Sequence, residues 1–285
     1  MKIAITAEST IDLTQELLQQ YDIKTIPFTV ILGDKDYIDG DIKPDDIFKF
    51  VSETGVLPKT TALNEYEYEE FFKSILTDYD AVIHFALSSG ISSSHSHAVA
   101  AANNLKNVYV IDSKSLSTGI ALQAIYARKL AESGLKVEDI VSKVEDRKSK
   151  VQASFVIERL DYLHKGGRCS GFKMLAANVL KIRPCIVLKD GKMINDGSKN
   201  GKGSMPFAVK KYCEAVLNEF HDIDKTIAFI TYSSATPEMV AAARTALEGA
   251  GVKTIYETNA GCTITSHCGE HTLGILYFND GGTTL

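Results

Sequence analysis

The sequence predicts an α/β fold built from two α/β domains, the first organised around a mostly parallel, Rossmann-like sheet. Short apolar segments of strand type alternate with amphipathic helical segments in the first half of the chain. A second series of strands begins near residue 150. The length of 285 residues suits two domains that share a cleft and bury a substantial core.

In the first half, apolar and β-branched runs predict the strands, and apolar residues at helical spacing predict the helices. Ser9 and Thr10 are expected to cap a helix that carries Leu13, Leu17 and Leu18. The expected strands span residues 2–6, 24–32, 81–87 and 108–111, and further helices span 43–54, 66–76, 116–133 and 137–148.

The second half changes to a mixed pattern. Asp190-Gly191 is expected to turn a hairpin within residues 183–194. Thr236-Pro237 opens a helix that Gly249 or Gly251 closes. Other strands are expected at 153–157, 227–232, 252–256 and 274–278, and a helical turn at 160–165. We therefore predict domains at 1–150 and 151–285, closely packed because no Pro/Gly/Ser linker separates them.

Composition narrows the function. The net charge of −5 and the pI of about 5.8 argue against general nucleic-acid binding, which depends on Lys and Arg. No apolar run is long enough to cross a bilayer, and the N-terminal segment resembles a strand more than a signal peptide. The cysteines are odd in number and form no CxxC pair, which predicts reduced thiols in a cytoplasmic protein.

Hydroxyl-rich segments follow three predicted strands, where ligands of parallel sheets bind. They are ESTID at 8–12, SSGISSS at 88–94 and DSKSLS at 112–117. Ser92 in the second segment could donate to a carboxylate without adding charge, as could Thr60 and Thr61. The alternative is that these hydroxyls cap the helices that follow.

Two segments in the second half add candidates. Gly166-Gly167-Arg168 could let the backbone approach a ligand while the guanidinium engages a carboxylate or phosphate, or it could be a helix end with a surface arginine. His267 could donate to an anion, or bind metal with His271 and a cysteine. Gly261 and Gly269 favour a loop around His267, which weakens the metal hypothesis.

Several common motifs are missing from the sequence. There is no GxGxxG after the first strand and no Walker A segment, so no cofactor is expected. There is also no GxSxG nucleophile elbow. A lipid hydrolase or acyltransferase that uses Ser92 as nucleophile and His267 as base nevertheless stays open as an alternative.

Several segments, in order along nearly the whole chain, resemble the DegV family of bacterial fatty-acid-binding proteins. They are KIAITAESTIDL, PKTT in place of a PKTSQPS-like segment, LSSGIS in place of LSSxLSGT, VIDSKSLSTG, LDYLHKGGR, KIRPCIVLKDG, and SHCGEHTLG in place of a His-x-Gly-Pro-Gly pattern.

The resemblance implies two α/β domains with a long-chain fatty acid in a tunnel between them. It implies that Thr60, Thr61, Ser92 and His267 hold the carboxylate. It further implies a non-catalytic carrier that presents the acid to a fatty acid kinase, with Arg168 contacting the partner or its phosphate. Transient membrane contact stays open.

The sequence departs from the family pattern at four places. Glu8 stands where the family has Asp, and Glu270-His271 stands where it has Pro-Gly. Ala62-Leu63-Asn64 replaces Gln-Pro-Ser, and Ser93-Ser94-His95 replaces Gly-Thr-aromatic. Three of these lie around the expected head-group site, so they bear on the choice of ligand and not on the fold.

Overall fold

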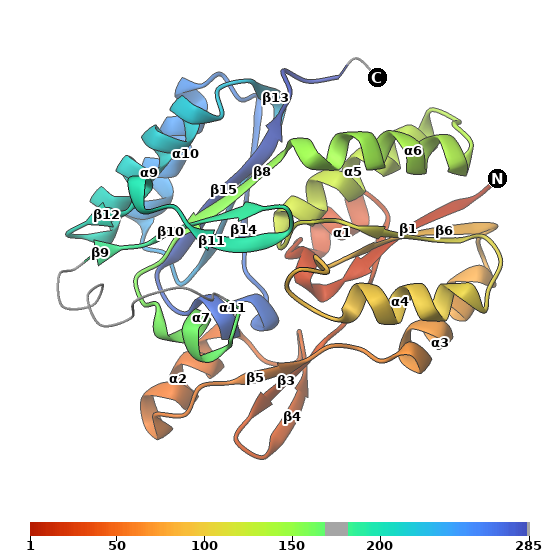
Figure 1. The fold of residues 1–285 in the computed structure, drawn as a ribbon, viewed down its shortest axis with the longest axis horizontal. Coiled ribbons are helices and arrows are strands. Elements are labelled where there is room, and N and C mark those ends of the chain that lie inside the picture. The colour runs from red at the N-terminus through yellow and green to blue at the C-terminus, as the bar shows by residue number, and fades with distance from the viewer. Residues whose placement is uncertain (169–181, 284–285) are drawn as a thin grey trace.

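The computed structural model describes residues 1–168 and 182–283, and it confirms the predicted α/β class (Figure 1). All strands of the first sheet run parallel, in the order β2-β1-β6-β7, as predicted for a Rossmann-like sheet. Helices cover both faces of this sheet. The strands are β1 (Ile3–Glu8), β2 (Ile23–Ile26), β6 (Ala81–Ala86) and β7 (Val108–Asp112), and the helices are α3 (Glu65–Leu76), α4 (Ser94–Asn103), α5 (Thr118–Glu132) and α6 (Val137–Arg147).

The second sheet is mixed, in the order β11-β10-β8-β15-β13-β14, and only β13 and β14 pair in parallel. Helices α9 (Met205–Glu219) and α10 (Pro237–Gly249) pack their buried residues on one face. The strands are β8 (Val151–Val156), β10 (Cys185–Lys189), β11 (Lys192–Asn195), β13 (Ile223–Ser233), β14 (Thr254–Asn259) and β15 (Thr272–Asn279).

Helix α5 joins the two sheets. Nearly all of its residues are buried, and one hydrophobic core links it to β1 and β6 on one side and to β8 and β15 on the other. A helix whose side chains are buried on nearly all sides lies inside the protein, and Figure 1 shows α5 between the sheets.

A third, smaller unit mixes both halves of the chain. The antiparallel sheet β4-β3-β5 packs with α2 against α7 and α11 through one shared core. These elements are β3 (Thr29–Leu32), β4 (Lys35–Ile38), α2 (Pro44–Thr54), β5 (Lys59–Thr61), α7 (Asp161–Lys165) and α11 (Cys262–Cys268). The remaining elements are η1 (Ser9–Ile11), α1 (Gln15–Gln20), η2 (Lys148–Lys150), β9 (Ile182–Arg183), η3 (Gly197–Lys199) and β12 (Gly201–Lys202).

Three expectations need correction. The single strand at 24–32 is two strands, because Pro27 lies between β2 and β3 and cannot donate to a ladder. Ser9 and Thr10 open only η1, while Thr14 caps α1 by accepting from Leu17 N. The predicted loop around His267 is helix α11: Gly261 is its N-cap and Gly269, at φ +74°, ends it, so both glycines lie outside the helix.

The sheets divide near the predicted boundary. The parallel sheet ends at Asp112, and the mixed sheet begins at Val151. The small unit crosses that division, so the domains 1–150 and 151–285 stay a proposal. Within the described residues, no helix combines the length and the apolar character that a membrane crossing requires.

Glu8, one of the departures from the family pattern, lies at the end of β1 in a fully buried polar network. Its carboxylate accepts hydrogen bonds from the Tyr68 hydroxyl at 2.7 Å and from Leu87 N at 2.8 Å. The His84 ring lies 3.4 Å from the same carboxylate and contacts Thr6 Oγ1 at 2.9 Å. A buried carboxylate is costly unless donors surround it, so this network fixes the end of β1.

We expect Tyr68→Phe to lower the free energy of unfolding by about 1–3 kcal/mol, because the buried Glu8 carboxylate loses a donor. Urea denaturation measures the change. The matched control is Tyr66→Phe on the same helix, where the ring is 71% exposed and little change is expected. Equal stability of the two variants would contradict this account.

Candidate ligand-binding site

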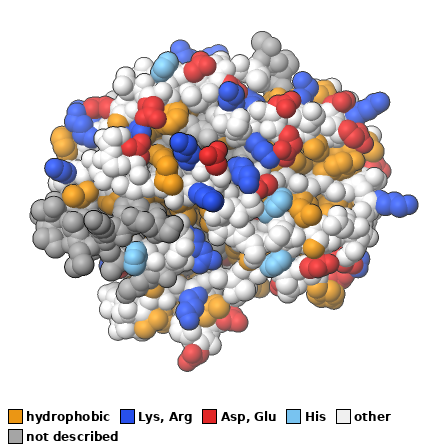
Figure 2. All heavy atoms as spheres, in the orientation of Figure 1, with side chains coloured by type: hydrophobic (Ala, Val, Ile, Leu, Met, Phe, Trp, Pro, Cys, Tyr) orange, Lys and Arg blue, Asp and Glu red, His pale blue; other side chains and the backbone are white. Residues whose placement is uncertain are grey.

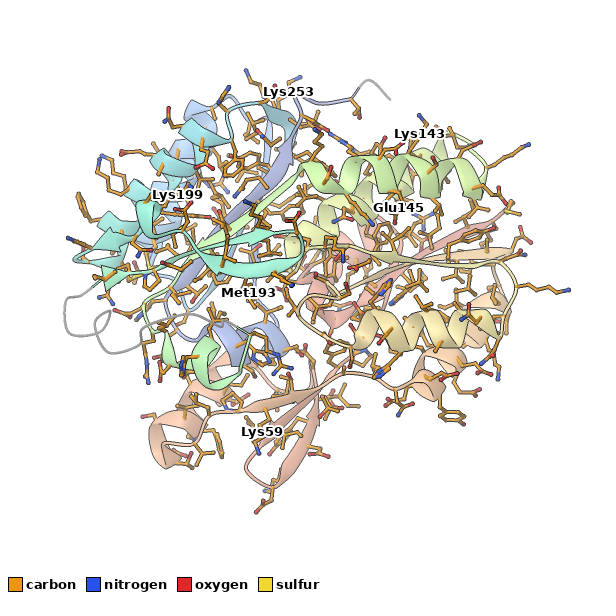
Figure 3. All side chains as sticks on the ribbon, viewed as in Figure 1. Lys59, Lys143, Glu145, Met193, Lys199 and Lys253 are labelled. Carbon is orange, nitrogen blue, oxygen red and sulfur yellow. The ribbon has the colours of Figure 1, made fainter. Side chains whose placement is uncertain are left out.

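A cavity of about 370 Å³ lies between the two halves of the chain, a size typical of small-molecule sites. Residues from β5, the turn after β6, β8, β11, β13, α11 and β15 line it. Much of the wall is apolar, and Met193, labelled in Figure 3, contributes from β11. The large apolar side chains are Phe28, Leu87, Ile91, Leu116, Phe155, Leu163, Met193, Ile264 and Leu276.

The residues that the sequence singled out converge on this cavity. Thr60, Thr61, Ser92, Arg168 and His267 all line it, although they come from four separate segments. The cap alternative for the threonines is wrong, because Thr60 and Thr61 belong to β5 and Asn64 caps α3. The roles of these five residues in binding stay predictions.

His267 and Thr60 form the central polar pair. Thr60 Oγ1 lies 2.8 Å from His267 Nε2, joining β5 to α11. Burial and, to a smaller extent, the nearby Arg168 guanidinium together lower the pKa of His267 from 6.5 to about 4. The imidazole is therefore neutral near pH 7.

The other ring nitrogen of His267 faces the end of α7. Nδ1 is buried and has no hydrogen-bond partner among the described residues. A Cβ atom on Gly166 would lie 2.8 Å from Nδ1 and 3.0 Å from Tyr162 O, although the backbone of Gly166 is helical. Gly166 is therefore small because the imidazole packs directly against it.

Two aspartate side chains from the first half of the chain hold the start of α11. Asp39 accepts from Cys262 N at 2.8 Å and Thr263 N at 3.2 Å, and Asp12 accepts from Gly261 N at 2.8 Å. The N-cap is a glycine, which has no side chain to cap its own helix. Asp12 and Asp39 take over that role from distant segments, and they thereby fix the helix that carries His267.

Ser92 lies in the turn between β6 and α4. Its backbone N–H donates to Ser88 O at 3.1 Å, and its hydroxyl accepts from Ser94 N at 3.2 Å. The cap alternative thus holds in part, because the Ser92 hydroxyl accepts from an amide of the first turn of α4 while the side chain also lines the cavity.

Arg168 follows the short helix α7. Gly167, at φ +71°, reverses the chain after Gly166, and the exposed Arg168 guanidinium donates to Gly166 O at 2.6 Å. This is the helix end with a surface arginine that the sequence offered as one alternative, yet the side chain also borders the cavity.

The geometry gives little support to a hydrolase or acyltransferase that uses Ser92 and His267, or to a metal site built from His267, His271 and a cysteine. His267 is bonded to Thr60, and it lacks a described carboxylate partner that would orient it as the base of a nucleophilic triad. His271 pairs instead with Glu158. Among the described residues, no three His, Cys, Asp or Glu side chains gather as a metal site would require.

Comparison with known proteins identifies the family. The model of the DegV family, described as uncharacterised, matches residues 2–280. The chain belongs to the DegV family. A DegV domain-containing protein of Caldanaerobacter subterraneus is 29% identical over 97% of this chain and 98% of its own length. A Thermotoga maritima protein named fatty acid-binding protein is 32% identical over 78% of this chain and 77% of its own.

Solved structures of the family share this fold. A DegV family protein of Thermus thermophilus, described for fatty acid binding, superposes with a TM-score of 0.89 at 25% identity and covers 98% of this chain and 99% of its own. DegV of Bacillus subtilis, described as a fatty acid binding protein, superposes with a TM-score of 0.84 at 25% identity and the same coverage.

In this DegV-family chain, two of the departures from the family pattern also reach the cavity. Ala62 and Ser93 line its wall. Sequence reasoning missed Asp12, Asp39 and Met193. Asp12 stands in the ESTID segment, which the sequence analysis singled out, so it could have been named as a candidate. The pairing of Asp39 with α11 joins residues far apart in the sequence and leaves no local signal.

The raised pKa of the buried Asp12 makes the stability of the fold depend on pH. Burial raises the pKa of Asp12 from 3.8 to about 8, against hydrogen bonds from Ser117 and Gly261 that favour the charged form. The folded chain therefore holds a proton that the unfolded chain releases near 3.8, so the contribution of Asp12 is full below that pH and falls as the pH rises toward about 8.

We expect Asp12→Asn to flatten this decline. The unfolding free energy of the wild type minus that of the variant should fall steadily as the pH rises from 3.8 to about 8. Urea denaturation at several pH values measures this difference. Asp34→Asn, on the surface, is the control and should leave the profile unchanged. A constant difference between wild type and Asp12→Asn across this range would refute the assignment.

Proposed function

We propose that this protein binds a long-chain fatty acid in the cavity and presents its carboxyl group to a fatty acid kinase, without catalysing a reaction itself. The observation that carries the proposal is the Thr60–His267 pair on the wall of a largely apolar cavity. A fatty acid has the matching form, with one polar end and one apolar chain.

The apolar wall supplies most of the binding free energy in this proposal. Burying one methylene group contributes roughly 0.8 kcal/mol, so a chain of about fourteen methylenes gains on the order of 11 kcal/mol before the cost of ordering it. The head group then needs only enough hydrogen bonds to offset the loss of water around the carboxylate.

The Thr60–His267 pair can supply such a hydrogen bond without a charge. A neutral imidazole has one N–H group, and a buried N–H without an acceptor is costly. We therefore place the proton of His267 on Nε2, where it donates to Thr60 Oγ1. The Thr60 hydroxyl hydrogen is then free to donate to the carboxylate, with Ser92 and Thr61 as further donors from the same wall.

Presentation to a kinase requires the carboxyl group near the surface. Thr61 and Arg168 are exposed residues of the cavity lining, so the proposed head-group region opens toward solvent. Arg168 would contact the kinase or the phosphate it transfers, because a guanidinium can bind phosphate with two parallel hydrogen bonds.

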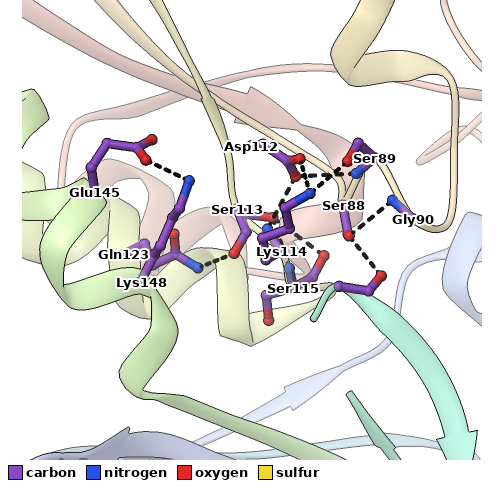
Figure 4. A network of polar contacts seen from close by, with 11 residues as sticks. Ser88, Ser89, Gly90, Asp112, Ser113, Lys114, Ser115, Gln123, Glu145 and Lys148 are labelled. Carbon is purple, nitrogen blue, oxygen red and sulfur yellow. Dashed lines mark hydrogen bonds and ion pairs between the residues drawn. The ribbon is translucent and has the colours of Figure 1, made fainter. Parts of the chain in front are cut away.

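The rest of the visible face shows mixed charge. Figure 2 shows basic and acidic side chains interspersed across it. Figure 4 shows two ion pairs of the chain from close by, Lys114–Asp112 and Lys148–Glu145. This mixture suits a protein partner better than a nucleic acid.

We also propose a cytoplasmic location, with transient membrane contact when the acid enters or leaves. In support, Cys185, Cys213, Cys262 and Cys268 are buried free thiols, as expected in a reducing compartment. Cys169 lies outside the described residues.

The binding prediction uses mass spectrometry and titration. The purified protein should release a long-chain fatty acid on denaturation, and Thr60→Val, Ser92→Ala and His267→Leu should each weaken binding by about fivefold or more. The first two variants each remove a donor to the carboxylate, and His267→Leu removes the partner that orients the Thr60 hydroxyl. Ser96→Ala is the matched control, since its exposed hydroxyl bonds only to Ser93 O. A wild-type protein that takes up no fatty acid would overturn the proposal.

The kinase prediction separates presentation from binding. With a fatty acid kinase and ATP, we expect Arg168→Ala to slow acyl phosphate formation by about tenfold while the affinity for the acid changes little, and Arg168→Lys to restore only part of the rate. Arg159→Ala is the control, because this arginine pairs with Asp161 nearby. Unchanged acyl phosphate formation in Arg168→Ala would remove this residue from the proposed contact.

A further inference from the structure

The tip of the β10–β11 hairpin touches the turns that follow β6 and β7 (Figure 4). The fully buried Ser88 hydroxyl donates to Gly191 O at 2.7 Å. A Cβ atom on Gly90 would lie 2.5 Å from the same oxygen, and one on Gly191 would lie 2.4 Å from Ser88 Oγ. The two backbones therefore meet directly, and we call Ser88, Gly90 and Gly191 the hairpin contact.

The β6 and β7 turns form a firm base for this contact. Asp112 accepts from Ser89 N at 3.1 Å and Lys114 N at 3.2 Å, and Lys114 Nζ bonds to both Ser89 and Asp112. These hydrogen bonds hold the pKa of Asp112 down at about 2, although burial acts in the opposite direction. Ser88 N also donates to Ser115 O, so the two turns are bound to each other.

The hairpin itself is held mainly at its base. β10 pairs with β8 only over Cys185 to Val187, and β11 is the edge strand, which pairs with β10 alone. The tip is a two-residue turn in which Asp190 and Gly191 both have positive φ. The part beyond Val187 thus extends past β8. There Leu188 and Met193 pack into the core shared with the first half of the chain, and the hairpin contact adds the hydrogen bond that joins the tip to that half.

This contact forms part of the cavity wall. Leu87 and Ile91 flank Ser88 and Gly90 in sequence, and both line the cavity. Met193, two residues after Gly191, and Leu116, next to Ser115, line it as well. Separating the hairpin tip from the two turns would therefore open the wall between the apolar residues of the two halves.

We propose that the hairpin contact is a latch through which the acyl chain enters and leaves the cavity. The identity of the ligand rests on the proposed function, whereas the latch rests on the contacts of Ser88, Gly90 and Gly191. Ser88 also accepts a backbone hydrogen bond from Ser92 N, but the latch itself uses Ser88 Oγ and Gly191 O, which are separate from that bond. Breaking the latch therefore changes the rate of exchange and leaves the bound complex intact.

Gly90→Ala tests the latch. The new methyl group displaces Gly191 O, and the φ of Gly90 is one that alanine tolerates. Stopped-flow experiments with a fluorescent long-chain fatty acid should show association and dissociation rates both raised by about fivefold, with Kd changed less than about twofold. Gly197→Ala is the matched control, because the nearest atom to its Cβ is at 3.7 Å, and its rates should equal those of the wild type.

Ser88→Ala provides a second variant if Gly90→Ala does not fold, as judged by circular dichroism. It removes the hydrogen bond to Gly191 O and should raise both rates in the same way. Unchanged rates in folded variants, or a weaker Kd with unchanged association, would overturn the latch. A wild-type protein that binds no fatty acid would instead overturn the proposed function.

Discussion

The capping of α11 by Asp12 and Asp39 is the interaction on which the site depends. Without the side-chain oxygens of these two aspartates, the first N–H groups of the helix would be buried without acceptors, because its N-cap is Gly261. Both aspartates come from the first forty residues, whereas the helix comes near the end of the chain. The helix that carries His267 therefore takes its place only when both halves of the chain have folded together.

The sequence predicted the sheets and helices well, and it predicted the contacts between distant segments of the chain poorly. Alternation of apolar strands and helices is a local signal, and β1, β6, β7 and α5 lie close to their expected positions. Gly261 and Gly269 indicate a loop around His267, yet the structure has a helix there. A helix capped by side chains from another segment needs no capping residue of its own. Helix α9 was not anticipated, although its buried positions follow helical spacing.

The candidate site was predicted from motifs and not from periodicity. Thr60, Ser92 and His267 became candidates through hydroxyl-rich segments and the family resemblance, and the fold brings them to one cavity. No local rule could place Thr60 against His267, since the two residues lie on elements more than two hundred positions apart. The pairing depends on β5 joining β3 and on α11 packing against that small sheet.

The cavity combines two requirements that oppose each other: a carrier must hold an apolar chain away from water and still release it. A lysine at the head group would retain a carboxylate strongly, whereas in the proposed function the neutral pair of Thr60 and His267 holds it by hydrogen bonds alone. Because the imidazole is neutral near pH 7, charge attraction adds little to retention. In the proposed latch, release is governed by how easily the hairpin tip separates from the β6 turn, to which the Ser88–Gly191 hydrogen bond and two apposed glycines join it.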